Sequence, residues 1–251
     1  MEIRFDHKTA IVTGAGQGIG LRICQLLIDA GARVVLNDSD PILCEEAGRA
    51  LGSNCAVVSG DAGRMETITT MVQTAKDRFG SVNCVVANAG VTLFGSFAGY
   101  TEESLDRLLA VNIKGSFLLA QQASNEMIRA RSGGSILFTS SVTGHQAHRN
   151  LAAYGMSKAA IEMLAKQLVV ELSEHAINVN AIAPGATLTE RTLNDAAYEK
   201  TWSRITPMGR PAHVDDVAKA ALYFISDEAR HITGQSLVID GGWTSVSPSP
   251  Y

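Results

Sequence analysis

The sequence contains 251 residues, of which 46% are hydrophobic and 18% are charged, with 25 acidic and 21 basic side chains. This is the composition of a folded globular chain, and it argues against a disordered or fibrous one. The length fits one large α/β domain or two small ones. A formal net charge of −4 provides no basic surface for nucleic acid or for an anionic membrane, so a small-molecule partner is favoured.

The cysteine positions and the N-terminus indicate the compartment. The four cysteines show no CxxC spacing and no clustering with histidine, so the sequence predicts neither a metal site nor a disulfide framework. They are Cys24, Cys44, Cys55 and Cys84. Residues 1–8 lack the apolar core of a signal peptide, and no apolar run approaches the roughly eighteen residues that span a bilayer. We therefore expect a soluble, unprocessed, cytoplasmic protein.

Seven short, apolar, β-rich runs alternate along the chain with longer segments of helical period. The predicted strands are residues 9–13, 33–37, 55–59, 84–87, 135–139, 176–183 and 236–239. Candidate helices follow the strands, for example residues 19–30, 64–79, 118–130, 153–173 and 214–225. Gly31 and Gly80 are placed to end two of these helices.

The predicted strands are apolar throughout and do not alternate, which is typical of a parallel sheet covered on both faces. The alternation of strands and helices predicts right-handed crossovers. The expected fold is therefore a single doubly wound, Rossmann-type α/β domain with a seven-stranded parallel sheet and helices on both faces. No repeat, low-complexity tract or linker divides the chain, and only residues 247–251, with two prolines, resemble a loose tail.

A glycine-rich turn joins the first predicted strand to the first predicted helix. Its residues are Gly14, Ala15, Gly16, Gln17, Gly18, Ile19 and Gly20. The positive end of the helix attracts phosphate, and a side chain at the glycines would keep a pyrophosphate away from the backbone amides. The spacing is TGxxxGxG and not GxGxxG, and an ordinary tight turn is the alternative interpretation.

Asp38 lies at the end of the second predicted strand, about twenty residues beyond the glycines, where a carboxylate can accept hydrogen bonds from a ribose diol. This favours NAD over NADP, because a 2′-phosphate would face a like charge and neither Gln17 nor Asn37 supplies a cation. The alternative is a solvated aspartate in a turn.

Tyr154 and Lys158 are four residues apart in a segment of helical period, so both side chains lie on one helix face. An ammonium group at that position stabilises a phenolate, although the same pair also occurs on ordinary exposed helices. Ser140 and Ser141 end the fifth predicted strand, at the sheet edge where open α/β folds bind ligands. A hydroxyl there can hold a carbonyl oxygen, and helix capping is the alternative role.

An ordered set of motifs over nearly the whole chain resembles the short-chain dehydrogenase/reductase family of about 250 residues. The set comprises TGAGQGIG at 13–20, Asn88 with Ala89 and Gly90, Asn112, Ser141 with Tyr154 and Lys158, Pro184 with Gly185, Thr233 to Gln235, and Asp240 to Gly242. Each piece alone is weak, but the set in this order and at these separations is specific.

The resemblance implies a role for each matching residue. Tyr154 would be the general acid or base, and Lys158 would make its phenol more acidic and hold the nicotinamide ribose. Ser141, preferred to Ser140 because it precedes Tyr154 by thirteen residues, would orient the substrate oxygen. Asn112 would hold a water that links Lys158 to solvent. The implied cofactor-binding residues are Gly14, Gln17, Gly18, Ile19, Gly20, Asp38, Asp61, Ala62, Asn88, Gly90, Tyr154, Lys158, Pro184, Gly185, Thr187 and Thr189. Two residues depart from the family pattern: Ala62 stands where a larger aliphatic residue is more usual, and Thr187 where the family often has a branched aliphatic residue.

We therefore expect an NAD-dependent oxidoreductase that interconverts a secondary alcohol and a ketone, most simply on a sugar, a polyol or a similar hydroxylated molecule. Substrate choice is expected to depend on residues 91–97, on the polar loop at 144–151 and on a lid at about 188–211. The resemblance also implies a homotetramer.

Two alternatives remain open. One is a 3-oxoacyl-[acyl-carrier-protein] reductase, which would prefer NADPH and dock an acidic partner through basic residues such as Arg129 and Arg131. The other is a nucleotide-binding protein without catalytic activity.

Overall fold

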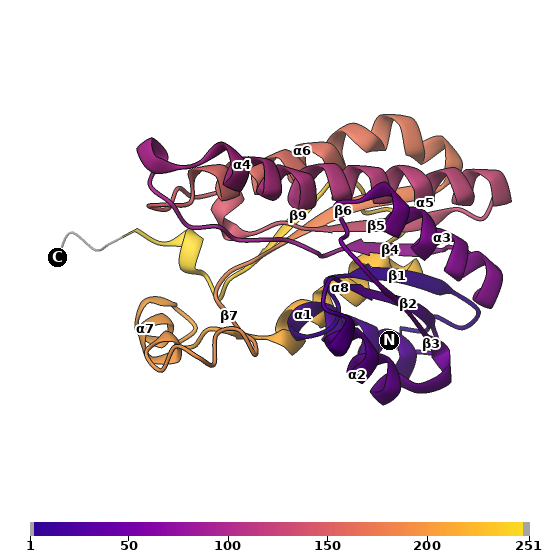
Figure 1. Cartoon of the computed structure of the whole chain (residues 1–251), viewed down its shortest axis with the longest axis horizontal. Helices are drawn as coiled ribbons and strands as arrows, with labels where there is room; N and C mark the ends of the chain where they lie inside the picture. Colours follow the sequence, from indigo (N-terminus) through magenta and orange to yellow (C-terminus); the bar gives the residue numbers. More distant parts are fainter. Residues whose placement is uncertain (1–2, 248–251) are drawn as a thin grey trace.

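Seven parallel strands form the central sheet of the computed structural model, which describes residues 3–247 (Figure 1). In chain order they are β1 (Thr9–Thr13), β2 (Arg33–Asp38), β3 (Cys55–Ser59), β4 (Cys84–Ala87), β5 (Gly134–Thr139), β6 (Ile177–Pro184) and β9 (Ser236–Ile239). Their order across the sheet is β3-β2-β1-β4-β5-β6-β9. The strand order reverses at β1, which pairs with β2 on one side and with β4 on the other. In open α/β sheets, ligands bind at the carboxyl ends of the strands near such a reversal.

Helices cover both faces of the sheet, as the sequence predicts (Figure 1). Below the sheet in this view lie α1 (Gly18–Asp29), α2 (Pro41–Leu51) and α8 (Val214–Ile225). Above it lie α3 (Met65–Phe79), α4 (Glu102–Leu109), α5 (Ser116–Ala130) and α6 (Ala152–Leu172). The two faces bury separate apolar cores, one against α1 and α8 and one against α3, α5 and α6. The single doubly wound domain is thus confirmed.

The edges of the sheet differ from its centre. All residues of β1, β4, β5 and β6 are buried, which explains why these strands read as continuous apolar runs. The edge strands are less covered, since Val57 in β3 is 38% exposed and Leu237 in β9 is 39% exposed. Coverage on both faces therefore holds for the inner strands and is incomplete at the two edges.

Helix boundaries follow local capping chemistry. Gly80 ends α3 in the left-handed conformation (φ 83°) and donates its N–H to the Lys76 carbonyl oxygen. Asp40 caps α2, where its carboxylate accepts bonds from the Ile42 and Leu43 N–H groups at 2.8 and 3.3 Å. The helices named from the sequence are present within two residues of their bounds, whereas α2, α4 and α7 (Tyr198–Ile205) were not delimited there.

Between β6 and α8 the chain makes an excursion that carries α7. It leaves through β7 (Thr187–Leu188) and returns through β8 (Ala212–His213), and these two short strands pair in parallel. The segment expected to form a lid thus begins and ends at one small ladder. Of the tail expected at 247–251, all but Ser247 lies outside the described residues.

Within residues 3–247, no helix has both the length and the apolar character that a membrane span requires.

Candidate active site

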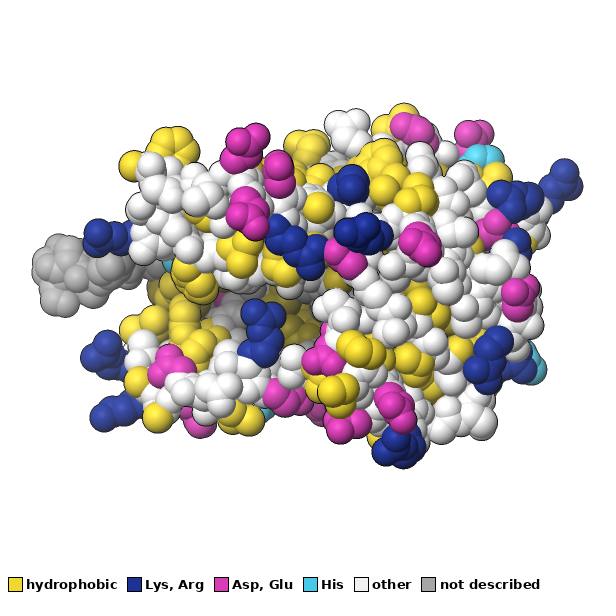
Figure 2. Space-filling model, in the orientation of Figure 1, with side chains coloured by type: hydrophobic (Ala, Val, Ile, Leu, Met, Phe, Trp, Pro, Cys, Tyr) yellow, Lys and Arg dark blue, Asp and Glu magenta, His cyan; other side chains and the backbone are white. Residues whose placement is uncertain are grey.

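A cavity of about 870 Å³ opens at the carboxyl edge of the sheet, where the turns after β1 to β6 meet. Figure 2 shows the hollow between the side of the molecule that carries α4 and α6 and the side that carries α7. Every cofactor-binding residue expected from the sequence lines this cavity, and so do Ser141, Tyr154 and Lys158. Asn112 is the one predicted site residue that does not.

The glycine turn at the start of α1 leaves no room for a side chain at Gly14 or Gly20. An ideal Cβ on Gly14 (φ 60°) would lie 2.8 Å from the Ala89 Cα, and one on Gly20 would lie 2.4 Å from the Gly14 carbonyl oxygen. Asn88 fastens the turn to the end of β4 by donating its side-chain N–H groups to the Thr13 and Gly14 carbonyl oxygens, each at 3.0 Å. The first turn of α1 contains no acidic residue. This backbone cradle at a positive helix end fits a dinucleotide pyrophosphate.

Asp38 lies at the edge of the cavity with its carboxylate held by backbone donors. Its Oδ2 accepts the Gly16 N–H at 3.0 Å and its Oδ1 accepts the Asp40 N–H at 3.2 Å. A carboxylate has about four acceptor positions, so it can still take hydrogen bonds from a diol. The neighbouring lining residues Ser39, Asp40 and Leu43 include no cation.

Asp61 is paired with Arg107 of α4, and both residues line the cavity. The distance from Arg107 Nη1 to Asp61 Oδ2 is 2.5 Å, and Asp61 Oδ1 accepts the Gly63 N–H at 2.9 Å. Burial would raise the pKa of Asp61, but the hydrogen bonds from Gly63 and Arg107 outweigh it and hold this pKa below its usual range. Any base that bonds to Asp61 therefore shares the carboxylate with a guanidinium.

Lys158 and Tyr154 project from the N-terminal part of α6. The Lys158 side chain is buried, its Nζ donates to the Thr139 carbonyl oxygen at 2.7 Å, and this nitrogen lies 5.5 Å from the centroid of the Tyr154 ring. An ideal Cβ on Gly90 would lie 3.2 Å from Nζ, so the glycine after β4 makes room for the ammonium group. A buried cation and a phenol thus lie together at the cavity wall.

The two serines after β5 have different partners. Ser140 is buried, and its hydroxyl lies 3.0 Å from the Lys158 carbonyl oxygen and 2.6 Å from the Glu162 carboxylate, to either of which it can donate. Ser141 Oγ accepts the Thr143 N–H at 3.2 Å. Because that bond uses an acceptor position, the Ser141 hydroxyl proton stays available to a ligand. Ser140 therefore serves internal hydrogen bonds, and Ser141 has the donor to offer.

Asn112 lies in a π-helical segment, Ala110–Gly115, between α4 and α5. Its amide exchanges two hydrogen bonds with the Val91 backbone, at 2.8 and 3.0 Å, and donates to Ser157 Oγ at 3.1 Å. The side chain is buried and ties the loop after β4 to α6. π-bulges often occur at functional sites. Here the bulge places a polar side chain behind the cavity wall.

The far end of the cavity is formed by the segment after β6. Gly185 packs against Asp240, because an ideal Cβ on Gly185 would lie only 2.7 Å from the Asp240 Cβ. The Thr187 hydroxyl donates to the Gly185 carbonyl oxygen at 3.1 Å. Thr189 and Tyr198 also line this end. Burial raises the pKa of the Tyr198 phenol, although a hydrogen bond with the Thr187 backbone opposes the shift.

Aromatic contacts connect α7 to the rest of the site. Trp202 lies 6.1 Å from Tyr198 and 5.0 Å, edge-on, from Trp243, measured between ring centroids. Trp243 in turn stacks on His148 at 5.0 Å. The expected lid, the C-terminal segment and the polar loop at 144–151 therefore meet in one cluster of rings.

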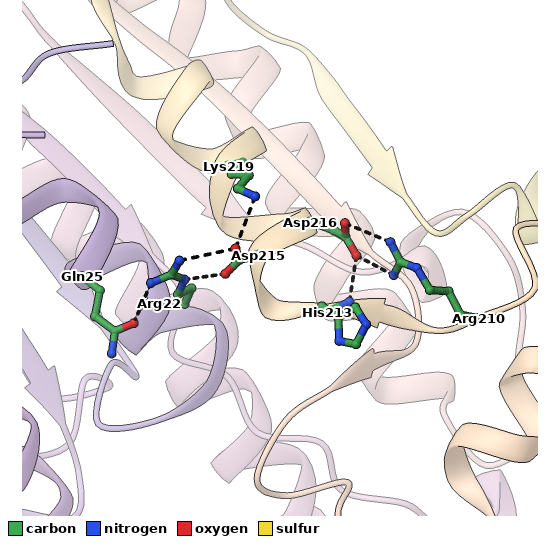
Figure 3. Close-up of polar contacts among 7 residues, drawn as sticks. All are labelled: Arg22, Gln25, Arg210, His213, Asp215, Asp216 and Lys219. Atoms are coloured by element: carbon green, nitrogen blue, oxygen red, sulfur yellow. Dashed lines mark hydrogen bonds and ion pairs between the residues drawn. The ribbon is translucent and has the colours of Figure 1, made fainter. Parts of the chain in front are cut away.

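Ion pairs fasten the base of the lid segment, as Figure 3 shows. Asp216 of α8 accepts from Arg210 at 2.7 and 3.2 Å and from the His213 N–H at 2.8 Å. Asp215 pairs with Arg22 of α1, the helix that begins at the glycine turn. Helix α1 and the returning end of the lid segment are thus joined at the start of α8.

In the part of the chain that the structure describes, no group of three or more His, Cys, Asp or Glu side chains is arranged to hold a metal ion. The four cysteines are buried free thiols.

Some residues of the site carry no signal in the sequence. Arg107 lies on α4, a helix that was not delimited, and Tyr198 lies on α7 within a segment expected only as a lid. Glu162 did carry a signal, because it follows Lys158 by four residues just as Lys158 follows Tyr154, which places all three on one face of α6.

Comparison with known proteins identifies the family. A family model described as enoyl-(acyl carrier protein) reductase matches residues 14–244. An NAD-dependent glycerol dehydrogenase of Listeria innocua is 36% identical over 245 residues, which cover 97% of this chain and 96% of the relative. The crystal structure of a 3-ketoacyl-(acyl-carrier-protein) reductase from Brucella melitensis, complexed with NADH, has a TM-score of 0.90 at 29% identity and covers 95% of this chain and 99% of that one.

A second solved structure is a gluconate 5-dehydrogenase from Burkholderia cenocepacia J2315 in complex with NADP and tartrate, with a TM-score of 0.89, 30% identity and 98% of each chain covered. The chain belongs to the short-chain dehydrogenase/reductase family. It is an oxidoreductase that acts on CH–OH groups with a nicotinamide nucleotide.

Proposed function

We propose that the protein is an NAD(H)-dependent oxidoreductase that interconverts a secondary alcohol and a ketone on a small hydroxylated molecule such as a polyol or a sugar. The observation that carries this proposal is the buried Lys158 ammonium, 5.5 Å from the Tyr154 ring centroid, in the same cavity as the glycine turn.

A bound nicotinamide supplies or accepts the hydride. Tyr154 gives a proton to the developing alkoxide oxygen during ketone reduction and removes it during alcohol oxidation. The Ser141 hydroxyl, whose oxygen already accepts the Thr143 N–H, donates a hydrogen bond to the same substrate oxygen and stabilises negative charge there, and it keeps its proton. Lys158 has three N–H donors, of which one goes to Thr139, so the others can hold a ribose hydroxyl.

The remaining site residues take supporting roles in this proposal. Asn112 holds the loop after β4 against α6, which keeps the floor of the cavity next to Lys158. The glycine turn and Asn88 hold the pyrophosphate, Asp61 and Ala62 the adenine, and Pro184 to Thr189 the nicotinamide end. The segment at about 188–211 closes over the substrate.

The charges around Asp38 support NAD in preference to NADP. Asp38 and Asp40 line that end of the cavity, and a 2′-phosphate would be repelled by both carboxylates. The cationic lining residues are Arg107, Lys158 and Arg191. Of these, Arg107 is engaged with Asp61, Lys158 bonds to Thr139 beside Tyr154, and Arg191 belongs to the lid segment.

A polyol or sugar substrate is supported by the relatives' names. Two relatives are named for glycerol and gluconate. No residue of the polar loop at 144–151 is among those that line the cavity, and the loop reaches the lid segment through the rings of His148, Trp243 and Trp202. Most residues of this loop from His145 to Asn150 are exposed.

A 3-oxoacyl-[acyl-carrier-protein] reductase is the second candidate, and the Brucella melitensis structure favours it. Such an enzyme would need a basic surface for its acidic partner. Arg129, one of the two residues expected to provide it, is paired with Glu126, which weakens this candidate.

We also propose a cytoplasmic homotetramer. Met156, Met163 and Val170 recur every seven residues along α6 and are 52%, 52% and 82% exposed, and Phe117 on α5 is 43% exposed. An exposed apolar stripe of this kind suits pairing with the same helix of a second subunit.

The test is a screen of NADH formation from NAD against glycerol, hexitols, aldonic acids and simple secondary alcohols, run in parallel with NADP. A clear preference for a hydroxylated substrate with NAD supports the proposal. Turnover confined to 3-oxoacyl thioesters with NADPH would establish the second candidate instead.

A further inference from the structure

A third polar side chain on the helix face of Tyr154 and Lys158 has no part in the chemistry described so far. Glu162 follows Lys158 by one helical turn, and its side chain is only 12% exposed. One oxygen, Oε1, takes both of its contacts: the Ser140 hydroxyl at 2.6 Å and the His145 Nε2 at 2.9 Å. A carboxylate buried to this extent is costly unless such donors satisfy it.

The two donors stand on either side of the turn that begins at Ser141. Ser140 precedes it, the 3₁₀ turn Val142–Gly144 follows, and His145 comes directly after. Glu162 therefore fixes the chain before and after the Ser141 hydroxyl. Because Ser141 caps this turn through Thr143, the direction of its hydroxyl depends on where the turn lies.

The turn packs on α6 with no spare room. An ideal Cβ on Gly144 would lie 3.1 Å from Glu162 Oε1 and 3.1 Å from the Ala159 nitrogen. From the other side, an ideal Cβ on Gly155 would lie 2.8 Å from the Thr143 carbonyl oxygen. Two glycines thus let the turn and the helix touch, and the Glu162 oxygen closes the contact at one end.

We propose that Glu162 is a positioning residue, which holds the Ser141 turn against α6 and so sets the Ser141 hydroxyl relative to Tyr154 on the same helix. This inference rests on the proposed role of Ser141 in catalysis. The Ser140 hydroxyl and His145 Nε2 both contact the same atom, Glu162 Oε1. Positioning therefore requires one acceptor oxygen at residue 162, and it does not require a negative charge. A relay of protons from Ser140 through Glu162 to His145 would instead require a carboxylate.

Two substitutions separate these possibilities. Glu162→Gln keeps the oxygen and loses the charge, so positioning predicts a kcat within about threefold of the wild type. Glu162→Met has a similar length but no oxygen acceptor, so kcat should fall by about tenfold with the dissociation constant of NADH unchanged. Glu171→Met, on an exposed part of the same helix, is the matched control and should leave kcat unchanged.

A double-mutant cycle tests whether Glu162 acts through Ser141. If it does, adding Glu162→Met to Ser141→Ala causes no further loss of kcat. His145→Ala, at an exposed position, removes the second contact of Glu162 and replaces Glu162→Met in the cycle if that variant does not fold. A several-fold loss of kcat is expected for His145→Ala in the wild-type background, and no further loss in the Ser141→Ala background.

Three results would overturn the inference: a wild-type kcat in both Glu162→Met and His145→Ala, equal losses in Glu162→Gln and Glu162→Met, or losses that multiply with that of Ser141→Ala. Wild-type turnover by Ser141→Ala alone would instead contradict the proposed function, and it is measured separately in the same cycle.

Discussion

Two side chains of this site, Asp38 and Ser141, accept hydrogen bonds from backbone N–H groups. Asp38 is fixed by the Gly16 and Asp40 N–H groups, and Ser141 by the Thr143 N–H. Because these donors lie in the folded turns of the protein itself, both side chains are oriented in the absence of a ligand. Such preorganisation is what electrostatic stabilisation in an enzyme requires.

Asp38 gives a prediction at this scale. Asp38→Asn keeps an oxygen for the Gly16 N–H but removes the negative charge, so repulsion of a 2′-phosphate decreases and bonding to a ribose diol weakens. The ratio of kcat/KM with NADH to that with NADPH should fall by about tenfold.

The measurement is initial rates with both cofactors on one ketone substrate. Asp106→Asn, on an exposed position of α4, is the control and should leave the ratio unchanged. A wild-type enzyme that already turns over faster with NADPH would contradict the role assigned to Asp38.

At the scale of elements, the start of α8 links α1 to the returning end of the lid segment. Arg210 and His213 bond to Asp216 at the returning end of the lid segment, while Asp215 pairs with Arg22 on α1. The ion pairs of Asp215 and Asp216 thus join α1 and the base of the lid segment within one helical turn (Figure 3).

Asp216 makes this link sensitive to acid. The hydrogen bond from Arg210 is the main reason that the pKa of Asp216 lies below its ordinary value of 3.8; burial opposes it and the His213 N–H adds to it. Because folding lowers this pKa, the carboxylate stabilises the protein above pH 3.8, and that contribution is lost as the pH falls through the lower folded-state value.

Asp216→Asn should therefore lower Tm near neutral pH by about 1–3 °C, as expected for a partly exposed ion pair. The difference in Tm from the wild type should shrink once the pH falls below 3.8. Thermal unfolding by circular dichroism at a series of pH values measures this. A difference in Tm that grows in acid would refute the assignment.

For the whole molecule, the sequence predicts the sheet and the cavity well and the periphery less well. The seven strands were found because buried parallel strands are apolar runs, and the glycine turn because only glycine fits it. The ends of α2, α4 and α7 depend on caps and on tertiary packing, which periodicity does not report. Arg107 contacts Asp61, which lies 46 positions earlier in the chain, and nothing in the local sequence indicates that contact. Glu162 could have been found from its spacing alone.

Assembly gives a prediction at the scale of the molecule. Met163→Glu places a charge in the middle of the exposed stripe on α6, so it should prevent the helix pairing of the proposed tetramer while the fold is kept. Light scattering after gel filtration should show a tetramer for the wild type and smaller species for the variant. Ile42→Glu, on a position of α2 that is 67% exposed, is the control. A stable wild-type monomer would contradict the proposal.

The central claim is that the Tyr154 phenol, beside the buried Lys158, transfers the proton at the reacting oxygen. The most direct test is the single-turnover rate of NADH oxidation by a ketone substrate in the wild type and in Tyr154→Phe, with NADH binding measured by fluorescence. The account predicts a rate at least about a hundredfold lower in Tyr154→Phe with NADH binding retained. Equal rates in the two proteins would contradict it.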